Sequence, residues 1–580
     1  MKKLNLLIAV GFTVSNSFAQ TFDYLTTGSI KARVDSKGNL FNGLSGGPGF
    51  EAPVGSGNST IISSSLWIGG TDAGSNLHLS AAPGDFQYGP LLEAVATTST
   101  MPSIWNKVWK VTAADVSYHI ANYMTSGYVP SPAIATWPAH GNSAYGEPYH
   151  VAPFFDYNGD NYYDPMAGDY PLIKGTQCIF QVYNDKIVHA SGGEPIGVEI
   201  QCMAYVFDCL DSALANTVFV NYRIINKSTA TYYDTYMSLW SDPDIGYGIN
   251  DYVGSDVSRG LIYAYNGSTS DASYDSILPA QGITVLGGPY LDADGIDNQI
   301  YSSYATAIAN NGIPYSDLGY GYNDVIVDNE RMGLRNSMYY MGAGAPHANM
   351  SDPTTAPQYY NYMRGLWRDG SSLFYGGNGY PGQPGVTATQ ANYAFFKDTD
   401  PIYWATSGTG VTPDWDEGLL PNLPSDRRMT GSMGPLTLMA GVSNEIDVAY
   451  TFARDYTQFH QTLAALPLLQ QRVDSLHSYF NANMTPCGSF TYSAVAENMQ
   501  ESIQFNVYPN PASNQLSISI NNQAKGMYYS LYDVLGNAVM NGDINSNKTL
   551  VDVSGISEGI YILEVTNGTE KSSKRIVVNR

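Results

Sequence analysis

The C-terminal stretch Phe505-Asn-Val-Tyr-Pro-Asn-Pro511 opens the part of the chain whose fold can be read most directly from the sequence. Leu516-Ser-Ile-Ser-Ile520 follows it and alternates apolar with polar residues, which is the pattern of a strand with one buried face. Residues 528–533, 559–566 and 574–578 are rich in β-branched and aromatic residues and are bounded by turn formers. About seven short strands in roughly 75 residues predict a small antiparallel β-sandwich.

Four motifs occur in order along this tail: Tyr508-Pro-Asn-Pro511, Leu531-Tyr-Asp-Val-Leu-Gly536, Gly559-Ile-Tyr-Ile-Leu563 and Lys574-Arg-Ile-Val-Val578. Together they resemble the type A C-terminal sorting domain of the Bacteroidota type IX secretion system, and the resemblance covers the whole tail. It implies that residues 504–580 are an export signal whose partners are the secretion machinery and a surface sortase. It also implies cleavage in the linker before the domain, near residues 494–502, followed by release or attachment of the body to a surface lipopolysaccharide.

The start of the chain is typical of a secreted protein. Met1-Lys-Lys3 is basic, residues 4–14 are apolar, and Ser17-Phe-Ala19 ends in a small residue. This pattern predicts a signal peptide over residues 1–19 that is too short to anchor the protein in a membrane. No later run reaches the roughly 18 apolar residues of a membrane-spanning helix. We therefore expect a secreted or cell-surface protein with no transmembrane segment.

The amino-acid composition is consistent with an extracellular protein. Charged residues make up only 13% of the 580 residues, while Gly (58) and Tyr (46) are abundant, which suits a loop-rich β protein. The formal net charge of −24 argues against nucleic acid or anionic lipid as a partner and favours cations. A chain of this length predicts two or more domains with a substantial core.

The four cysteines are too few for a disulfide scaffold. Cys178, Cys202 and Cys209 lie close together in the sequence, and one pair among them can be oxidised outside the cytoplasm. Cys487 lies near the linker. The pattern leaves open buried thiols or a single disulfide.

An acidic loop between residues 156 and 169 is the clearest candidate site of the body. Asp156, Asn158 and Asp160 occupy positions 1, 3 and 5 of an EF-type loop. The remaining candidate ligands are the Tyr162 carbonyl, Asp164 and Asp169. Oxygen donors at alternate positions suit calcium, although position 6 is not glycine and position 12 is not glutamate. The alternative is an Asx-rich surface turn that needs no metal.

Two further acidic clusters follow in the sequence. The first contains Asp242, Asp244, Asp251 and Asp256, and the second contains Asp292, Asp294 and Asp297 in an Asp-x-Asp-Gly context. A divalent ion would relieve the repulsion among carboxylates at this density. Solvated acidic loops remain the alternative for each cluster.

The fold class predicted for the whole chain is mainly β. We expect an N-terminal β and loop region over residues 20–175 and a β-sandwich-like body over 176–485, with long Asp- and Gly-rich loops. A helix over 458–483 should end the body, because Leu466, Leu469, Val473, Leu476 and Phe480 form a 3-4-3-4 apolar stripe. A linker over 486–503 then leads to the small β-sandwich of the tail. Trp105 and Trp109 fit a core position better than a sugar-binding platform.

The sequence carries no catalytic signature. His140 and His150 lack metalloprotease spacing, and neither a nucleophile elbow nor a phosphate-binding loop occurs. A glycosidase requires two carboxylates at a defined separation, which only a structure reveals. The candidates for such a pair, with Trp415 as a neighbouring sugar platform, are Asp328, Glu330, Asp369, Asp414, Asp416 and Glu417.

Two functions remain open. The first is a calcium-stabilised surface protein that binds a polysaccharide or another cell-surface ligand, as an adhesin does, or serves a structural role. The second is a secreted hydrolase, with glycoside hydrolysis favoured over proteolysis, since cargo of this secretion system often includes hydrolases. Two carboxylates, or a carboxylate and a histidine, that converge in an aromatic cleft would favour the hydrolase.

Overall fold

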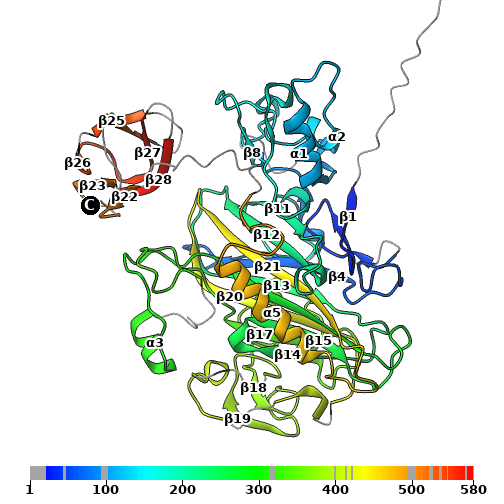
Figure 1. Ribbon diagram of the computed structural model, residues 1–580. Helices are drawn as coiled ribbons and strands as arrows, with labels where there is room; N and C mark the ends of the chain where they lie inside the picture. Colours follow the sequence, from blue (N-terminus) through cyan, green and yellow to red (C-terminus); the bar gives the residue numbers. More distant parts are fainter. Residues whose placement is uncertain are drawn as a thin grey trace, which may run out of the picture. The chain divides into compact units, whose positions relative to one another are not determined.

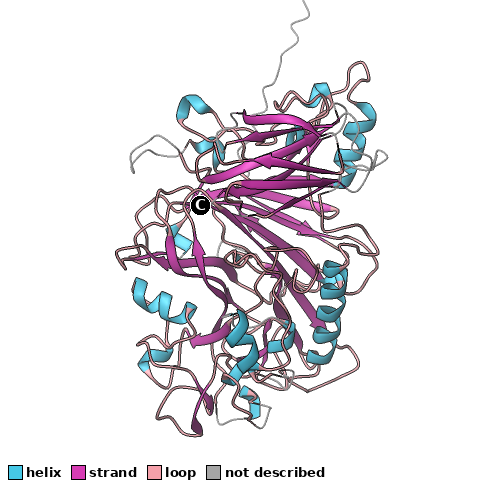
Figure 2. Ribbon diagram, turned by 90° about the vertical axis from the view of Figure 1, so that its left-hand side faces the viewer, coloured by secondary structure: helices cyan, strands magenta, loops and turns pink. Residues whose placement is uncertain are grey.

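We analysed a computed structural model of the chain, which divides into a large body and a C-terminal unit (Figure 1). The structure describes residues 21–43, 47–81, 83–92, 102–311, 320–396, 400, 402–411, 415–419, 422–492, 505–510, 512–520, 527–533, 538–544, 546–567 and 571–578. The predicted signal peptide, the expected cleavage region at 494–502 and the candidate Asp414 lie outside these residues. The structure is rich in antiparallel strands, and the prediction of a mainly β fold is confirmed (Figure 2).

The largest sheet of the body has nine antiparallel strands. Its order is β14-β15-β16-β21-β12-β11-β10-β6, and β7 also pairs with β10. The strands are β6 (Gln87–Tyr88), β7 (Trp109–Thr112), β10 (Gln177–Asn184), β11 (Val198–Val206), β12 (Thr217–Asn226), β14 (Asp251–Asp256), β15 (Leu261–Asn266), β16 (Pro279–Gly287) and β21 (Ser443–Arg454).

A second sheet of five strands has the order β17-β20-β13-β4-β5. Its strands are β4 (Ser63–Thr71), β5 (Leu77–Ser80), β13 (Tyr232–Asp242), β17 (Asn336–Met341) and β20 (Arg427–Leu438). The body also contains three small sheets. The first consists of β1 (Phe22–Thr26), β2 (Lys31–Asp35) and β3 (Phe50–Glu51). The second pairs β8 (Phe154–Phe155) with β9 (Tyr170–Pro171), and the third pairs β18 (Phe374–Gly376) with β19 (Val386–Gln390). Residue 175 is the expected end of the N-terminal region, but each large sheet contains strands from before and after it. In the five-stranded sheet β4 pairs with β13, and in the nine-stranded sheet β7 pairs with β10.

The two large sheets pack over a common core. Val218 and Val220 of β12 join Trp67 of β4 and Leu239 of β13 in one buried cluster. Phe219 of β12 belongs to a different cluster, because successive side chains of a strand point to opposite faces. The nine-stranded sheet is therefore covered on both faces, which explains why β11 and β12 are almost entirely buried.

The helix predicted over 458–483 is α5 (Leu466–Asn481), which begins later than predicted, and all five residues of its apolar stripe are buried. It packs on β16 and β21 and begins with Pro467 in its first turn, where the missing N–H costs nothing (Figure 1). The described residues contain four further helices that the sequence analysis did not anticipate: α1 (Ala113–Asn122), α2 (Pro132–Ala135), α3 (Tyr304–Asn311) and α4 (Ala356–Met363).

One disulfide joins Cys209, which follows β11, to Cys487, which follows α5. Cys178 and Cys202 are buried free thiols on the neighbouring strands β10 and β11. The disulfide therefore does not form among Cys178, Cys202 and Cys209, which are close in the sequence, but joins Cys209 to the distant Cys487. Burial raises the pKa of the Cys202 thiol to about 12, so this thiol stays protonated and unreactive.

The C-terminal unit contains two antiparallel sheets around one core. The first has the order β22-β23-β26 and the second has the order β25-β24-β27-β28. The strands are β22 (Phe505–Tyr508), β23 (Gln515–Ile520), β24 (Met527–Tyr532), β25 (Ala538–Ile544), β26 (Lys548–Asp552), β27 (Gly559–Thr566) and β28 (Lys571–Val578). Ile518 of the first sheet and Leu531 and Leu563 of the second share one buried cluster. The seven strands and the shared core form the small β-sandwich that the alternating pattern predicts.

Candidate functional site

The acidic loop of residues 156–169 runs from β8 to β9 and is organised around Asp156. Asp156 Oδ1 accepts hydrogen bonds from the backbone N–H of Gly159 (2.7 Å) and Asp160 (3.2 Å), and Oδ2 accepts from Asn161 (2.7 Å). Asn158 Oδ1 accepts from the N–H of Asp160 at 3.0 Å, and Asp160 Oδ1 accepts from the N–H of Tyr162 at 2.8 Å. The loop therefore closes a series of Asx turns on itself.

Asp169 fastens the base of the same loop. Its side chain is buried, and its two oxygens accept the N–H groups of Tyr157 (2.9 Å) and Asp164 (2.7 Å). Burial raises the pKa of Asp169. Asp164 in turn accepts the N–H of Met166 at 2.8 Å. The oxygens in these hydrogen bonds are the ones predicted to bind calcium. Each carboxylate oxygen has a second lone pair, which is available to a metal ion.

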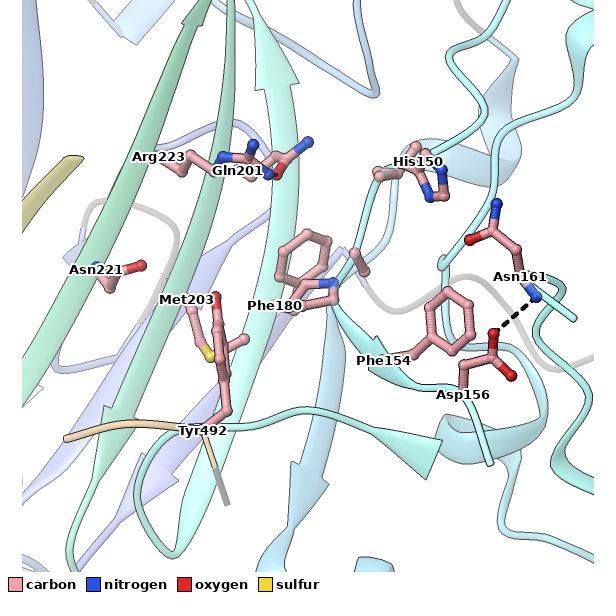
Figure 3. Close-up of a pocket in the computed structure, with 13 residues that line it drawn as sticks. His150, Phe154, Asp156, Asn161, Phe180, Gln201, Met203, Asn221, Arg223 and Tyr492 are labelled. Carbon is pink, nitrogen blue, oxygen red and sulfur yellow. Dashed lines mark hydrogen bonds between the residues drawn. The ribbon is translucent and has the colours of Figure 1, made fainter. Parts of the chain in front are cut away.

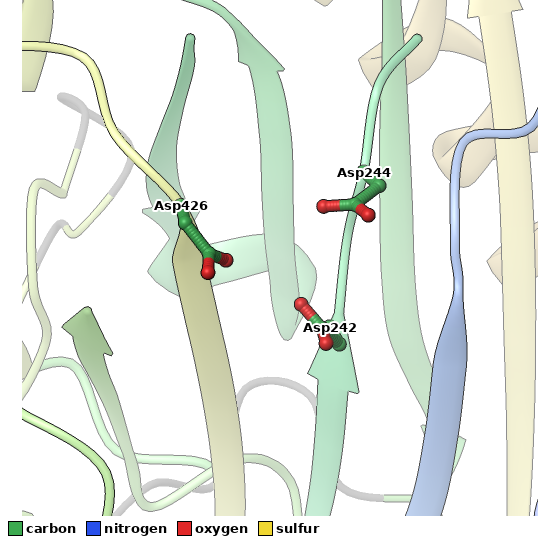
Figure 4. Close-up of side chains that lie close together, drawn as sticks. All are labelled: Asp242, Asp244 and Asp426. Atoms are coloured by element: carbon green, nitrogen blue, oxygen red, sulfur yellow. The ribbon is translucent and has the colours of Figure 1, made fainter. Parts of the chain in front are cut away.

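A tighter acidic group forms where β13 ends and β20 begins. Ligand oxygens of Asp242, Asp244 and Asp426 lie within 4.8 Å of one another (Figure 4). Burial raises the pKa of Asp242 to about 8 and the pKa of Asp244 to about 6, and neighbouring carboxylates act in the same direction. The first two residues are close together in the sequence and were predicted as one cluster, whereas Asp426 was not predicted.

The other two carboxylates of that predicted cluster lie elsewhere. Asp251 is fully buried on β14, and its Oδ2 accepts the N–H of Ile245 at 3.1 Å. Asp256, at the end of the same strand, pairs with Arg259 at 2.8 Å. The structure therefore divides the four predicted ligands into one convergent pair and two separately bound side chains.

The predicted cluster of residues 292–297 does not converge on one centre. Asp292 accepts the N–H of Thr437 (2.8 Å), whereas Asp294 accepts the N–H of Ile296 (3.0 Å). Asp297 accepts the N–H of Val325 at 2.8 Å. Each carboxylate accepts a hydrogen bond from a different backbone segment, so these residues stabilise loops.

A cavity of about 300 Å³ opens between the nine-stranded sheet and the segment around β8 (Figure 3). The sheet contributes Phe180 of β10, Gln201 and Met203 of β11, and Asn221 and Arg223 of β12. The facing wall and rim consist of His150, Val151, Ala152, Pro153, Phe154, Asp156, Asn161 and Tyr492. The cavity thus combines aromatic rings with uncharged polar groups, one arginine and one carboxylate.

The polar groups of the cavity are positioned by neighbours. Asn221 Nδ2 donates to Glu445 (2.6 Å) and Asp447 (2.8 Å), which leaves its carbonyl oxygen as an acceptor. Arg223 donates to Gln201 Oε1 at 3.3 Å. Burial lowers the pKa of His150, so its imidazole is neutral at pH 7 and can both donate and accept a hydrogen bond.

None of the described carboxylates proposed for hydrolysis lines this cavity. Among the described residues that line it, Asp156 is the one carboxylate, and it already accepts three backbone N–H groups. Glu417 is buried against Arg427 at 2.7 Å, and Asp369 accepts from Tyr380 Oη at 2.8 Å. Trp415 is only 2% exposed and is a core residue, so the prediction of a sugar platform there was wrong.

The remaining predicted aromatic candidates are structural as well. Trp105 and Trp109 are buried, as the core prediction states. Their indole N–H groups donate to Glu147 Oε1 (2.7 Å) and to the Thr136 carbonyl (2.6 Å). Three cavity residues were missed: Gln201 on β11, and Asn221 and Arg223 on β12, which occupy alternate polar positions within two apolar strands. That interruption of the apolar pattern is the signal that marks them.

Comparison with known proteins places the tail in a family. Residues 506–579 match the family of secretion system C-terminal sorting domains. The chain therefore carries the sorting domain of type IX secretion cargo, which engages the secretion machinery and indicates a secreted or cell-surface protein. No helix in the described part of the chain has the length and apolar character needed to cross a membrane.

The body resembles solved structures only remotely. A polysaccharide lyase matches with 8% identity and a TM-score of 0.18, over 66% of this chain and 34% of the lyase chain. PorZ, a surface component of the type IX secretion system of Porphyromonas gingivalis, matches with 10% identity and a TM-score of 0.12, over 75% of this chain and 48% of PorZ. The chain thus spans less than half the length of each, and similarity at this level carries no argument about the body. A search of curated proteins gave no match.

Proposed function

We propose that the exported body is a binding protein that takes a saccharide into the cavity between the nine-stranded sheet and the β8 segment. The observation that carries this proposal is the lining of the cavity. Phe154, Phe180 and Tyr492 offer apolar ring surface, and the side chains of Gln201 and Arg223 offer hydrogen-bonding groups. A sugar ring presents apolar C–H faces and polar hydroxyl edges, which this combination of side chains matches.

The same lining supports binding over glycoside hydrolysis. Cleavage by acid and base requires two carboxylates on opposite sides of the bond. The described cavity residues supply Asp156 alone, and the loop N–H groups already bind it. His150 shares the cavity with Asp156, but no hydrogen bond joins the two. An adhesin-like role on the cell surface or in the medium follows from this binding activity and from the sorting domain.

The test is retention of the full-length protein on a panel of insoluble polysaccharides, with the supernatant assayed for released oligosaccharides. Tyr492→Ala and Arg223→Ala should each weaken retention about 5-fold or more, since one aromatic or charged contact is worth about 1 kcal/mol or more. Tyr233→Ala, which removes a 46% exposed ring on β13, is the matched control. Release of oligosaccharides would replace the binding proposal with an enzymatic one. Equal retention of all three variants would show that the saccharide does not bind in the cavity.

We further propose that calcium stabilises the loop of residues 156–169. The support is that Asx turns hold Asp156, Asn158 and Asp160 at alternate positions of a single tight loop. At 100 times its dissociation constant, calcium adds about 2.7 kcal/mol to a body that binds it only when folded. The thermal midpoint should therefore rise over an EDTA control, and Asp156→Ala with Asp160→Ala should reduce that rise. An unchanged rise in the double variant would assign calcium stabilisation to another site.

A further inference from the structure

The end of β13 and the start of β20 bring together carboxylates that are far apart in the sequence. In the antiparallel pairing of these strands, Ser241 lies opposite Met429. Continuing that register beyond the ladder puts Asp242 opposite Arg428 and Asp244 opposite Asp426. Asp242 thus ends β13, Asp426 directly precedes β20, and Asp244 lies two residues beyond β13, so the pairing of the two strands brings the three aspartates close together.

The carboxylates around the three aspartates outnumber the positively charged side chains. Arg428 Nη2 lies 3.1 Å from Asp242 Oδ2, Arg428 Nη1 pairs with Asp426, and Arg428 Nε lies 3.6 Å from Asp352. One guanidinium therefore faces four carboxylates, the fourth of which is Asp244. Within the described chain, the Asp244 carboxylate takes part in no hydrogen bond.

One oxygen of the group is buried without a partner. Asp242 is 8% exposed, and its Oδ1 accepts no hydrogen bond, although Oδ2 contacts Arg428. A buried acceptor without a partner costs about 1–3 kcal/mol, and more when it is charged. Figure 4 shows the carboxylates of Asp242, Asp244 and Asp426 turned toward a common space beside the two strands. A cation in that space would satisfy the free Oδ1.

Two glycines leave the room that this arrangement needs. A Cβ on Gly248 would lie 2.0 Å from Asp244 Oδ1, and a Cβ on Gly342 would lie 2.4 Å from Asp426 Oδ2. Any larger residue at either position would displace a carboxylate. The backbone therefore approaches both carboxylates closely, and at Gly342 it also makes room for Arg428, whose Nη1 would lie 2.0 Å from a Cβ.

The donor set defines the class of ion. All three side chains offer carboxylate oxygen, which hard cations prefer, and none offers nitrogen or sulfur. Calcium binds oxygens at about 2.3–2.6 Å, so two of its ligands can be separated by about 5 Å across the ion. Oxygens within 4.8 Å of one another can therefore share one calcium ion with little movement.

We propose that Asp242, Asp244 and Asp426 bind one divalent cation, Ca²⁺ in preference to Mg²⁺, and thereby lock the end of β13 to the start of β20. This site is separate from the cavity and from the loop of residues 156–169. Calcium is favoured because Mg²⁺ demands nearly ideal octahedral geometry, whereas strand-end carboxylates form an irregular set. The site ties together two strands at the centre of the five-stranded sheet.

The test counts bound calcium and measures the thermal midpoint of the full-length protein after chelation and after calcium is restored. Asp244→Asn with Asp426→Asn should bind one fewer calcium per chain than the wild type. The thermal midpoint of this variant should fall further below the wild-type value in calcium than in chelator, because only the wild type gains from the ion, whereas the loss of the Asp426–Arg428 pair acts in both conditions. Asp208→Asn, an exposed carboxylate outside the group, is the matched control, and Asp156→Ala with Asp160→Ala should leave this site occupied.

Two outcomes would overturn the metal site, and a third would overturn its preference for calcium. Equal calcium stoichiometry in the wild type and the Asp244→Asn/Asp426→Asn variant would place calcium elsewhere. A midpoint lowered equally in chelator and in calcium would identify a structural ion pair without a metal. Asp244→Asn alone serves if the double variant fails to fold, because it removes a charge but no hydrogen bond. An equal midpoint shift with magnesium would overturn the preference for calcium.

Discussion

Arg331 Nη1 lies 2.8 Å from Asp447 Oδ2, and both side chains are buried. The same guanidinium donates to the carbonyls of Gly287 and Glu445 at 2.9 Å each and to that of Gly288 at 2.8 Å. It therefore joins the end of β16 to β21, where the cavity residue Asn221 also binds Asp447. One arginine supports both the nine-stranded sheet and the wall of the candidate binding site.

Replacing this arginine should destabilise the body strongly. Arg331→Leu removes the guanidinium from a buried carboxylate, which keeps Asn221 and Lys174, and from three carbonyls, so we expect a loss of about 3 kcal/mol or more in the free energy of unfolding. Urea unfolding at pH 7 measures it. Arg364→Ala, an exposed arginine after α4, is the control and should cost about 0.5 kcal/mol or less. Equal losses in the two variants would contradict the role of the buried pair.

The same pair predicts how stability depends on pH. Burial raises the pKa of Asp447, but Lys174 and Arg331 lower it more, and the net pKa is below the ordinary value. A carboxyl whose folded pKa is depressed stabilises the protein above its unfolded pKa of about 4 and loses that contribution as the pH falls through the folded pKa. Asp447→Asn should therefore be less stable at pH 7 but lose less stability between pH 4 and 2. Parallel acid-unfolding curves would count against this assignment.

The Cys209–Cys487 disulfide closes a segment of 278 residues. Removing it with Cys209→Ser and Cys487→Ser should cost about 2–5 kcal/mol, because the unfolded chain regains the freedom of a long loop. Alkylation followed by mass spectrometry checks the pairing. The unfolded, unreduced protein should expose two thiols, Cys178 and Cys202, and the reduced protein should expose all four. Labelling of Cys209 or Cys487 before reduction would disprove the disulfide.

Local patterns predicted the features that depend on neighbouring residues. The stripe from Leu466 to Phe480 predicted α5, because residues three and four apart share one helix face. The alternation in residues 516–520 predicted β23 for the corresponding reason. Helix α1 had a readable signal that was missed, since Thr112 and Asp115 form a capping box. These elements could all be found within a single window of sequence.

Features that depend on strand register could not be read in this way. Asp426 joins Asp242 only through the pairing of β13 with β20, about 180 residues apart along the chain. The expected grouping of Asp242 with Asp256 followed proximity in sequence, but β14 carries Asp256 into the other sheet. Trp415 resembled a sugar platform because of its acidic neighbours, although a core position buries it. Long-range pairing decided each of these cases.

Export should depend on the fold of the sorting domain, which neighbouring residues of β27 can test. Leu563 is fully buried in the core of the C-terminal unit, whereas Ile562 is exposed on the opposite face. Leu563→Asp buries an unpaired charge, which costs several kcal/mol, and should unfold this small domain. Ile562→Asp introduces the same charge one position away and should be tolerated. Cell fractionation should therefore find the first variant retained inside the cell envelope and the second at the surface or in the medium, with an unchanged thermal midpoint of the body in both. Export of both variants at the wild-type level would show that the machinery reads an unfolded segment of the tail and does not require its β-sandwich.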